Sequence, residues 1–100
     1  MAQPIYKLFQ AKFTEAWHQL PGEEQRRLET QVEEALAQVG AKRVLLCVSA
    51  WANEQWTAFG VEEFPDIEAV QKHSQLLIEL NWFRYLESIT TLGTPYTPEP

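Results

Sequence analysis

The chain is poor in cysteine, and this excludes an internal disulfide. Its one cysteine, Cys47, lies inside an apolar run with no helix start beside it, so we interpret it as a buried and unreactive thiol. The sequence also lacks a His-x-x-x-His pair, so we expect no metal site. Nothing in the cysteine usage indicates an oxidising compartment.

Basic residues are also few. Eight Lys and Arg are set against fourteen Asp and Glu, which gives a net charge of −6, and the basic residues are scattered along the chain. A nucleic-acid surface needs a concentrated basic patch, so we expect no nucleic-acid partner. No apolar run approaches the roughly 18 residues of a membrane span, and no signal peptide is visible at the start. We therefore expect a cytoplasmic protein with no membrane partner.

Apolar and aromatic residues are plentiful by contrast. Hydrophobic residues make up 45% of the 100 positions, and four of the aromatics are Trp, which is ample for one folded core. We expect a single domain over residues 1–94. Residues 95–100 hold three prolines, which cannot sustain a strand ladder, so we interpret them as a C-terminal tail.

The clearest local signal is a pair of apolar runs, Val44–Trp51 and Trp56–Phe64. Both are rich in β-branched and aromatic residues, which indicates two strands of a β-hairpin. The polar link between them predicts a four-residue loop over residues 52–55. Gly60 inside the second strand indicates a bulge or the close approach of another group.

The flanking segments predict two more strands and two helices. Strands are expected at Ile5–Phe13 and Tyr85–Leu92. The first helix begins at Pro21-Gly22 and ends at Gly40, and the second begins after Asp66, a good N-cap. The inward stripe of this second helix is expected to comprise Ile67, Val70, Ser74, Leu77 and Ile78, with Asn81 as an optional last member. Leu76 and Leu80 widen the stripe toward His73, which lies on its flank.

The resulting βαββαβ order predicts an α+β, ferredoxin-like fold. Right-handed crossovers place both helices on one face of a four-stranded antiparallel sheet. The other face of the sheet then exposes more apolar surface than a monomer tolerates. We therefore expect self-association through that face.

Three segments resemble a known group of proteins. The passage from strand to helix over Glu62–Ala69, within the βαββαβ order, resembles the dimeric α+β barrel superfamily of antibiotic-biosynthesis-monooxygenase-like proteins. Within it, Trp17–Arg26 and Asn81–Leu86 resemble the darcynin-like proteins, whose function is unknown. The resemblance implies a homodimer with a pocket between sheet and helices in each subunit. Superfamily members include cofactor-independent oxygenases, haem-degrading enzymes and isomerases, and we expect no cofactor here.

Candidate site residues are drawn from the histidines, aromatics and carboxylates. We expect His73 to be the catalytic proton acceptor, and we expect a small aromatic ligand to be bound by Trp82, Tyr85, Asn81 and Trp56. Each of these aromatics has an alternative role in the core or the dimer interface, and each histidine an alternative role as a surface or boundary residue. Glu62 or Glu87 buried near a pocket is a candidate acid or base, or a partner for Arg43, Lys12 or Lys7.

The function that these residues favour is that of a small-molecule-binding, monooxygenase-like protein. The resemblance implies a reaction, the cofactor-free oxidation of an aromatic or polyketide-like substrate. The alternative is a non-catalytic dimeric interaction or stress-associated protein, in which the aromatics serve only the core and the interface.

Overall fold

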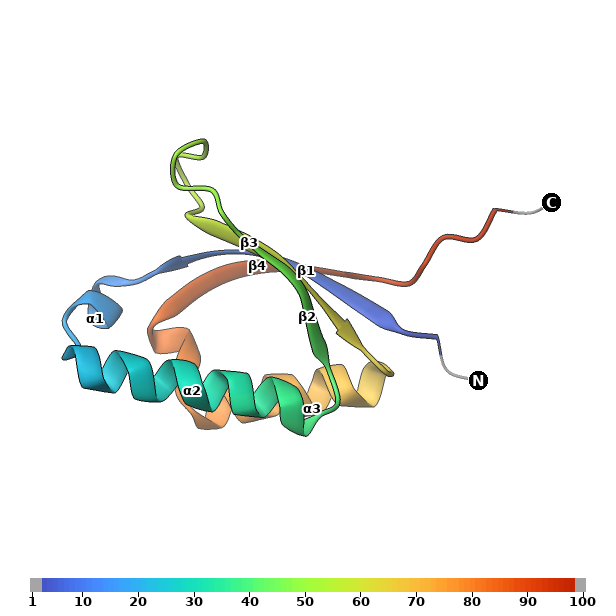
Figure 1. Ribbon diagram of the computed structural model, residues 1–100, viewed down its shortest axis with the longest axis horizontal. Helices are drawn as coiled ribbons and strands as arrows, with labels where there is room; N and C mark the ends of the chain where they lie inside the picture. Colours follow the sequence, from blue (N-terminus) through green and yellow to red (C-terminus); the bar gives the residue numbers. More distant parts are fainter. Residues whose placement is uncertain (1–2, 99–100) are drawn as a thin grey trace.

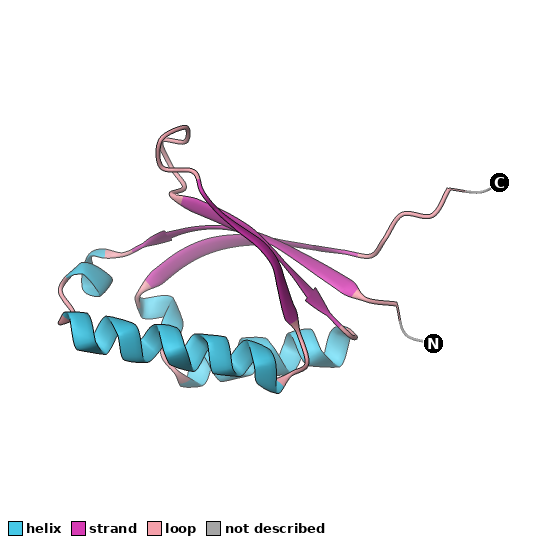
Figure 2. Ribbon diagram, viewed as in Figure 1, coloured by secondary structure: helices cyan, strands magenta, loops and turns pink. Residues whose placement is uncertain are grey.

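The computed structural model describes residues 3–98, and they form a ferredoxin-like α+β fold (Figures 1 and 2). One layer is a four-stranded antiparallel sheet and the other is made of helices, which all lie on one face of the sheet. The elements follow the order β1 (Ile5–Phe13), α1 (Glu15–His18), α2 (Gly22–Gln38), β2 (Lys42–Val48), β3 (Ala58–Phe64), α3 (Ile67–Glu79), η1 (Trp82–Arg84, a 3-10 helix) and β4 (Leu86–Gly93). The predicted fold is confirmed.

The strands lie in the order β2-β3-β1-β4, and β1 is therefore central, paired with both β3 and β4. Each long helix connects strands that are not neighbours in the sheet, which brings α2 and α3 to the same face. Residues 94–98 have no regular secondary structure, and the end of the predicted tail, residues 99–100, lies outside the described residues.

The helix boundaries match their sequence signals. Helix α2 begins at Gly22, directly after Pro21, and is followed by Gly40 with a φ of +75°, a conformation that glycine adopts without strain. Before α3, the Asp66 carboxylate accepts a hydrogen bond of 2.8 Å from the backbone N–H of Ala69. This bond satisfies one of the free amides of the first turn, and it confirms the prediction that Asp66 is the N-cap of the helix.

The hairpin strands are shorter than predicted, and nine residues, 49–57, connect them instead of four. Polar side chains within this connection replace the ladder. The Asn53 carboxamide oxygen accepts hydrogen bonds of 2.8 Å from the N–H groups of Gln55 and Trp56, and the Ser49 hydroxyl donates to the carbonyl of Trp56. The loop projects away from the sheet and leaves Trp51 85% exposed (Figure 1).

The buried stripe of α3 shares Val70 and Leu77 with the predicted one, but it is centred on His73. Val70, His73 and Leu77 are buried, whereas Ile67 and Ile78 are exposed. Val70, His73 and Leu77 are spaced by three and then four residues, so they form a helical stripe as regular as the predicted one. The imidazole of His73 packs against the ring of Phe64, with the ring centroids 5.2 Å apart, so His73 and not Ile78 faces the core.

Gly60 is a point of close approach, as its position in a strand predicts. A Cβ added there would lie 2.7 Å from the ring of Phe9, its neighbour on β1, and 3.0 Å from the carbonyl oxygen of Leu45. The phenyl ring therefore lies over the glycine. The register of β2 also shifts beside it, between Arg43 and Leu45.

The face of the sheet that points away from the helices carries exposed apolar residues. Leu8, Val61 and Leu45 form one row across β1, β3 and β2, and Leu8 and Leu45 are 46% and 41% exposed. Ile89 on β4 is also exposed, and Cys47 on β2 is half-buried. We call Leu8, Leu45, Val61 and Ile89 the outer apolar patch.

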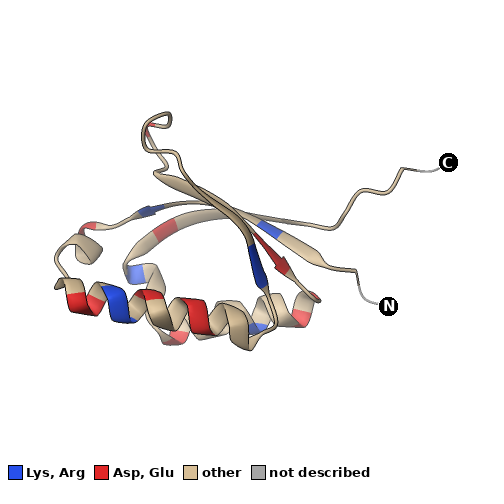
Figure 3. Cartoon of the chain, viewed as in Figure 1, with Lys and Arg blue, Asp and Glu red and all other residues tan. Residues whose placement is uncertain are grey.

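Charged side chains are distributed unevenly between sheet and helices (Figure 3). Helix α2 carries five glutamates and two arginines, while the β2–β3 connection carries one charged residue, Glu54. Three charged residues of the sheet, Lys7, Arg43 and Glu62, face the helices and line the cavity described next.

Candidate functional site

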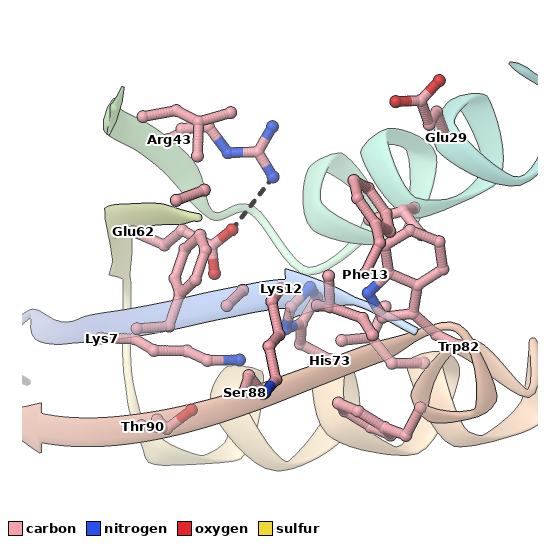
Figure 4. A pocket seen from close by; sticks show the side chains of 18 of the residues that line it. Lys7, Lys12, Phe13, Glu29, Arg43, Glu62, His73, Trp82, Ser88 and Thr90 are labelled. Carbon is pink, nitrogen blue, oxygen red and sulfur yellow. Dashed lines mark hydrogen bonds and ion pairs between the residues drawn. The ribbon is translucent and has the colours of Figure 1, made fainter. Parts of the chain in front are cut away.

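A cavity of about 270 Å³ lies between the sheet and the helices (Figure 4). Its size is close to the lower end of the range for small-molecule sites, about 300–1,000 Å³. All four strands contribute to its roof, while α2, α3 and η1 contribute the opposite wall. One end is polar and the other is aromatic.

The polar end is built by one row of residues across three strands. Lys7 on β1 lies opposite Glu62 on β3, and Glu62 lies opposite Arg43 on β2. The Arg43 guanidinium donates to the Glu62 carboxylate over 3.1 Å, and Glu62 is only 4% exposed (Figure 4). On its outer side Arg43 also pairs with the exposed Glu33 of α2. Glu62 is thus the buried member of the predicted carboxylates.

Lys7 is a half-buried cation in this row. No carboxylate of the described residues lies within ion-pair distance of its ammonium group. Burial lowers the pKa of Lys7, and the nearby charge of Glu62 opposes that effect.

His73 enters the cavity from α3 and is 2% exposed. Neither ring nitrogen has a hydrogen-bonding partner among the described residues. Burial lowers the pKa of His73 to about 4, and the positive charges of Lys7 and Arg43 act in the same direction. The imidazole is therefore neutral at pH 7, with one nitrogen free to accept a proton and the other free to donate one. Expectations of a surface or boundary position for this histidine are wrong.

The aromatic end is formed by rings from β1, α1 and η1. Phe13 stacks on Trp17 with ring centroids 4.4 Å apart, and Trp82 meets both rings edge-on at 6.2 and 5.7 Å. Phe13 and Trp82 line the cavity, and Trp17 supports them from the core. Such edge-on pairs hold the rings in fixed orientations.

The structure brings together only some of the predicted site residues. His73 and Trp82 line the cavity. Tyr85 packs against the Trp17 core cluster, and Asn81 is exposed in a left-handed conformation at the end of α3. Trp56 lines an adjoining pocket that shares Lys12 and Ser88 with the cavity, and the Lys12 ammonium is 5.7 Å from the indole ring.

Lys7, Arg43 and Phe9 are cavity residues that the sequence interpretation did not assign to the site. Lys7 and Phe9 alternate with the outer-facing Leu8 along β1, so the strand period alone places them on one face. Because Lys7 shares a strand face with the apolar Phe9 and Ala11, its position on β1 is the sequence signal that could have identified it as a site residue. The sequence interpretation treats Arg43 and Lys7 only as ion-pair partners of Glu62 or Glu87. Glu87 instead pairs with Lys12, over 3.4 Å.

No group of three His, Cys, Asp or Glu within residues 3–98 is arranged to hold a metal ion. In the same part of the chain, no helix has both the length and the apolar character needed to cross a membrane.

Solved structures with the same fold include enzymes and uncharacterised proteins. A chlorite dismutase variant from Candidatus Nitrospira defluvii superposes with a TM-score of 0.78 at 13% identity, covering 99% of this chain and 43% of that one. A protein of unknown function from Rhodopseudomonas palustris gives 0.67 at 16% identity, covering 98% and 86% of the two chains. A hypothetical Arabidopsis thaliana protein gives 0.62 at 15% identity, covering 98% and 93%.

These likenesses define the fold class, an α+β ferredoxin-like domain shared with chlorite dismutase. The chain spans less than half the length of the chlorite dismutase chains that it matches. No protein-family model matches the sequence, and neither does any curated protein sequence.

Proposed function

We propose that this protein binds a small organic molecule in the cavity between sheet and helices, with His73 as the proton acceptor. The observation that supports this most directly is the buried imidazole, which faces the cavity with both nitrogens unpaired. A buried polar group without a partner costs about 1–3 kcal/mol, so a ligand that pairs with it recovers that cost. The rings of Phe9, Phe13 and Trp82 supply apolar contact for the rest of the ligand.

The reaction that we propose is monooxygenase-like: the oxidation by dioxygen of an aromatic or polyketide-like substrate, without a cofactor. This rests on the resemblance of the sequence to antibiotic-biosynthesis-monooxygenase-like proteins. In this cavity His73 would take up an acidic proton of the substrate. A neutral imidazole can do so, and an anion formed beside it would raise its proton affinity.

We further propose that two copies associate through the outer apolar patch. Leu8 and Ile89 are about half exposed on a face with no helix over it. The Cα radius of gyration, 14.7 Å, exceeds the roughly 13 Å typical of 100 residues, so the chain by itself is less compact than usual. A second sheet packed on this face would bury the patch.

The alternative is a non-catalytic dimeric interaction protein whose aromatics serve core and interface. Tyr85 and Trp17 support it, since both pack in the core. The two readings differ in whether the cavity takes a ligand.

A screen of small aromatic compounds by two-dimensional NMR tests cavity binding. We expect hits to shift the indole N–H of Trp82 and the amides of Ser88 and Thr90, which line the cavity. The Ala58→Trp substitution should abolish binding, because a large side chain at this lining position fills the space. Trp51→Phe in the exposed loop is the control and should leave binding unchanged. Hits whose shifts map only to Leu8 and Ile89 would contradict the proposal.

Native mass spectrometry tests the dimer. We expect a species of twice the chain mass, and loss of that species in the Leu8→Glu variant, because dimerisation would bury an unpaired carboxylate. Ile78→Glu places the same charge at an exposed apolar position on α3 and should leave the dimer intact. A wild-type monomer at micromolar concentration would disprove association through this patch.

A further inference from the structure

The interior of the cavity carries more positive than negative charge. Lys7 and Arg43 face a single buried carboxylate, that of Glu62, which is ion-paired with Arg43. The Lys7 ammonium has no such partner among the described residues. A cation in a partly dehydrated site attracts an anion much more strongly than one in water does.

Charges at the rim do not remove this excess. Glu29 and Glu33 of α2 are exposed, and Lys12 is paired with the exposed Glu87. Glu33 contacts the outer side of Arg43, but its side chain is 56% exposed. Water and salt screen such exposed charges, so they neutralise the interior only weakly.

Hydrogen-bond donors at this end of the cavity also lack acceptors. The Nε–H group of Arg43 is buried with no partner in the described part of the chain, and the same holds for His73. A neutral imidazole supplies one N–H donor, and the Lys7 ammonium supplies up to three. Oxygen atoms bearing a negative charge are the acceptors that satisfy such donors best.

The opposite end offers mainly apolar contact. Phe13, Leu77 and Trp82 line it, and the phenyl ring of Phe9, held in place over Gly60, lies between the two ends. A ligand that fits both ends therefore has an apolar, ring-sized body and one charged group.

We infer that the natural ligand is an apolar organic anion whose acidic group lies between Lys7, the Nε–H of Arg43 and His73. This inference rests on the proposed function, because it specifies the charge of the molecule that the cavity takes. Lys7 is the residue that selects for the anion. The body of the ligand lies against Trp82 and Phe13.

Three probes of nearly the same shape but different charge test the inference: 2-naphthoate, 2-naphthamide and 2-naphthylmethylammonium. Calorimetric titration of the wild-type protein at pH 7 is expected to give at least about tenfold tighter binding of the carboxylate than of the amide, since one charged hydrogen bond separates them. The ammonium probe should bind most weakly. This series does not depend on the folding of any variant.

The Lys7→Met substitution keeps the length of the side chain and removes its charge. We expect it to lower the preference for carboxylate over amide to about threefold or less. Lys42→Met, a change of the same kind at an exposed position on β2 outside the cavity lining, should keep the wild-type preference. Circular dichroism of both variants verifies that they are folded.

Each result bears on a different claim. Amide binding as tight as carboxylate binding, or a preference lost in Lys42→Met but kept in Lys7→Met, overturns the anion assignment and leaves cavity binding standing. Failure of all three probes to shift the Trp82 indole signal overturns both the assignment and the proposed function.

Discussion

Replacing Phe64 by alanine is expected to lower the free energy of unfolding by about 3–5 kcal/mol, the usual cost of removing a fully buried phenyl ring. Phe64 is the one large side chain with no exposed surface in the described chain, at the end of β3. It packs with Leu36 of α2 and Val70 of α3, so it joins the sheet to both long helices. Its loss leaves a cavity where the three elements meet.

Urea denaturation followed by circular dichroism at several protein concentrations measures this effect and separates folding from association. Phe83→Ala is the matched control, because Phe83 is 46% exposed and its truncation is expected to cost less than about 1 kcal/mol. Equal destabilisation by the two substitutions would contradict the core described here.

The stability of the wild-type protein is expected to rise between about pH 4 and pH 6.5 through His73. In the folded state the pKa of His73 is lowered to about 4, whereas an unfolded histidine titrates near 6.5. The unfolded chain therefore binds more protons within this window, and stability increases with pH wherever that holds. The difference between these two pKa values limits this contribution to at most about 3.4 kcal/mol, less what solvent in the cavity screens.

Denaturation curves from pH 4 to pH 7.5 for wild type and His73→Leu test this prediction. Both proteins carry the same carboxylates, so the difference between the two curves isolates the histidine. Stability of the variant should change less with pH below 6.5. His18→Gln, a change at the other, exposed histidine, should follow the wild-type curve. Parallel curves for wild type and His73→Leu would show that the imidazole is not dehydrated.

The two lysines of β1 show how differently one strand can use the same residue. Lys12 pairs with Glu87, lies 5.7 Å from the Trp56 ring and reaches the rim of the cavity. Lys7 lies on the opposite face of the strand, toward the helices, with no ion pair in the described residues. The strand period separates the faces, but it does not indicate which of them the helices cover.

Much of the fold could be predicted because its signals are local. The start of α2 after Pro21, the N-cap Asp66 and the left-handed Gly40 each act within one turn of backbone. Two predictions were wrong in part, where local signals compete. In the β2–β3 connection, the side chain of Asn53 displaced ladder pairing, and on α3 two apolar stripes of equal regularity were available.

The candidate site was predictable only in part. His73 and Trp82 were chosen as residue types suited to chemistry, and both line the cavity. Asn81 and Tyr85 were chosen for the same reason, yet one is exposed and the other packs in the core. Residue type and spacing indicate the chemistry that a side chain can perform, but they do not indicate which side chains lie together in the folded protein.

The sequence by itself determined the order of the elements, their caps and the apolar character of both sheet faces. These properties depend on neighbours a few residues apart, which any short stretch of chain contains. Only the tertiary structure decided that Lys7, Glu62 and Arg43 form one row and that His73 faces it from α3. That arrangement depends on strand register and helix rotation, which are fixed when segments distant in the chain pack together.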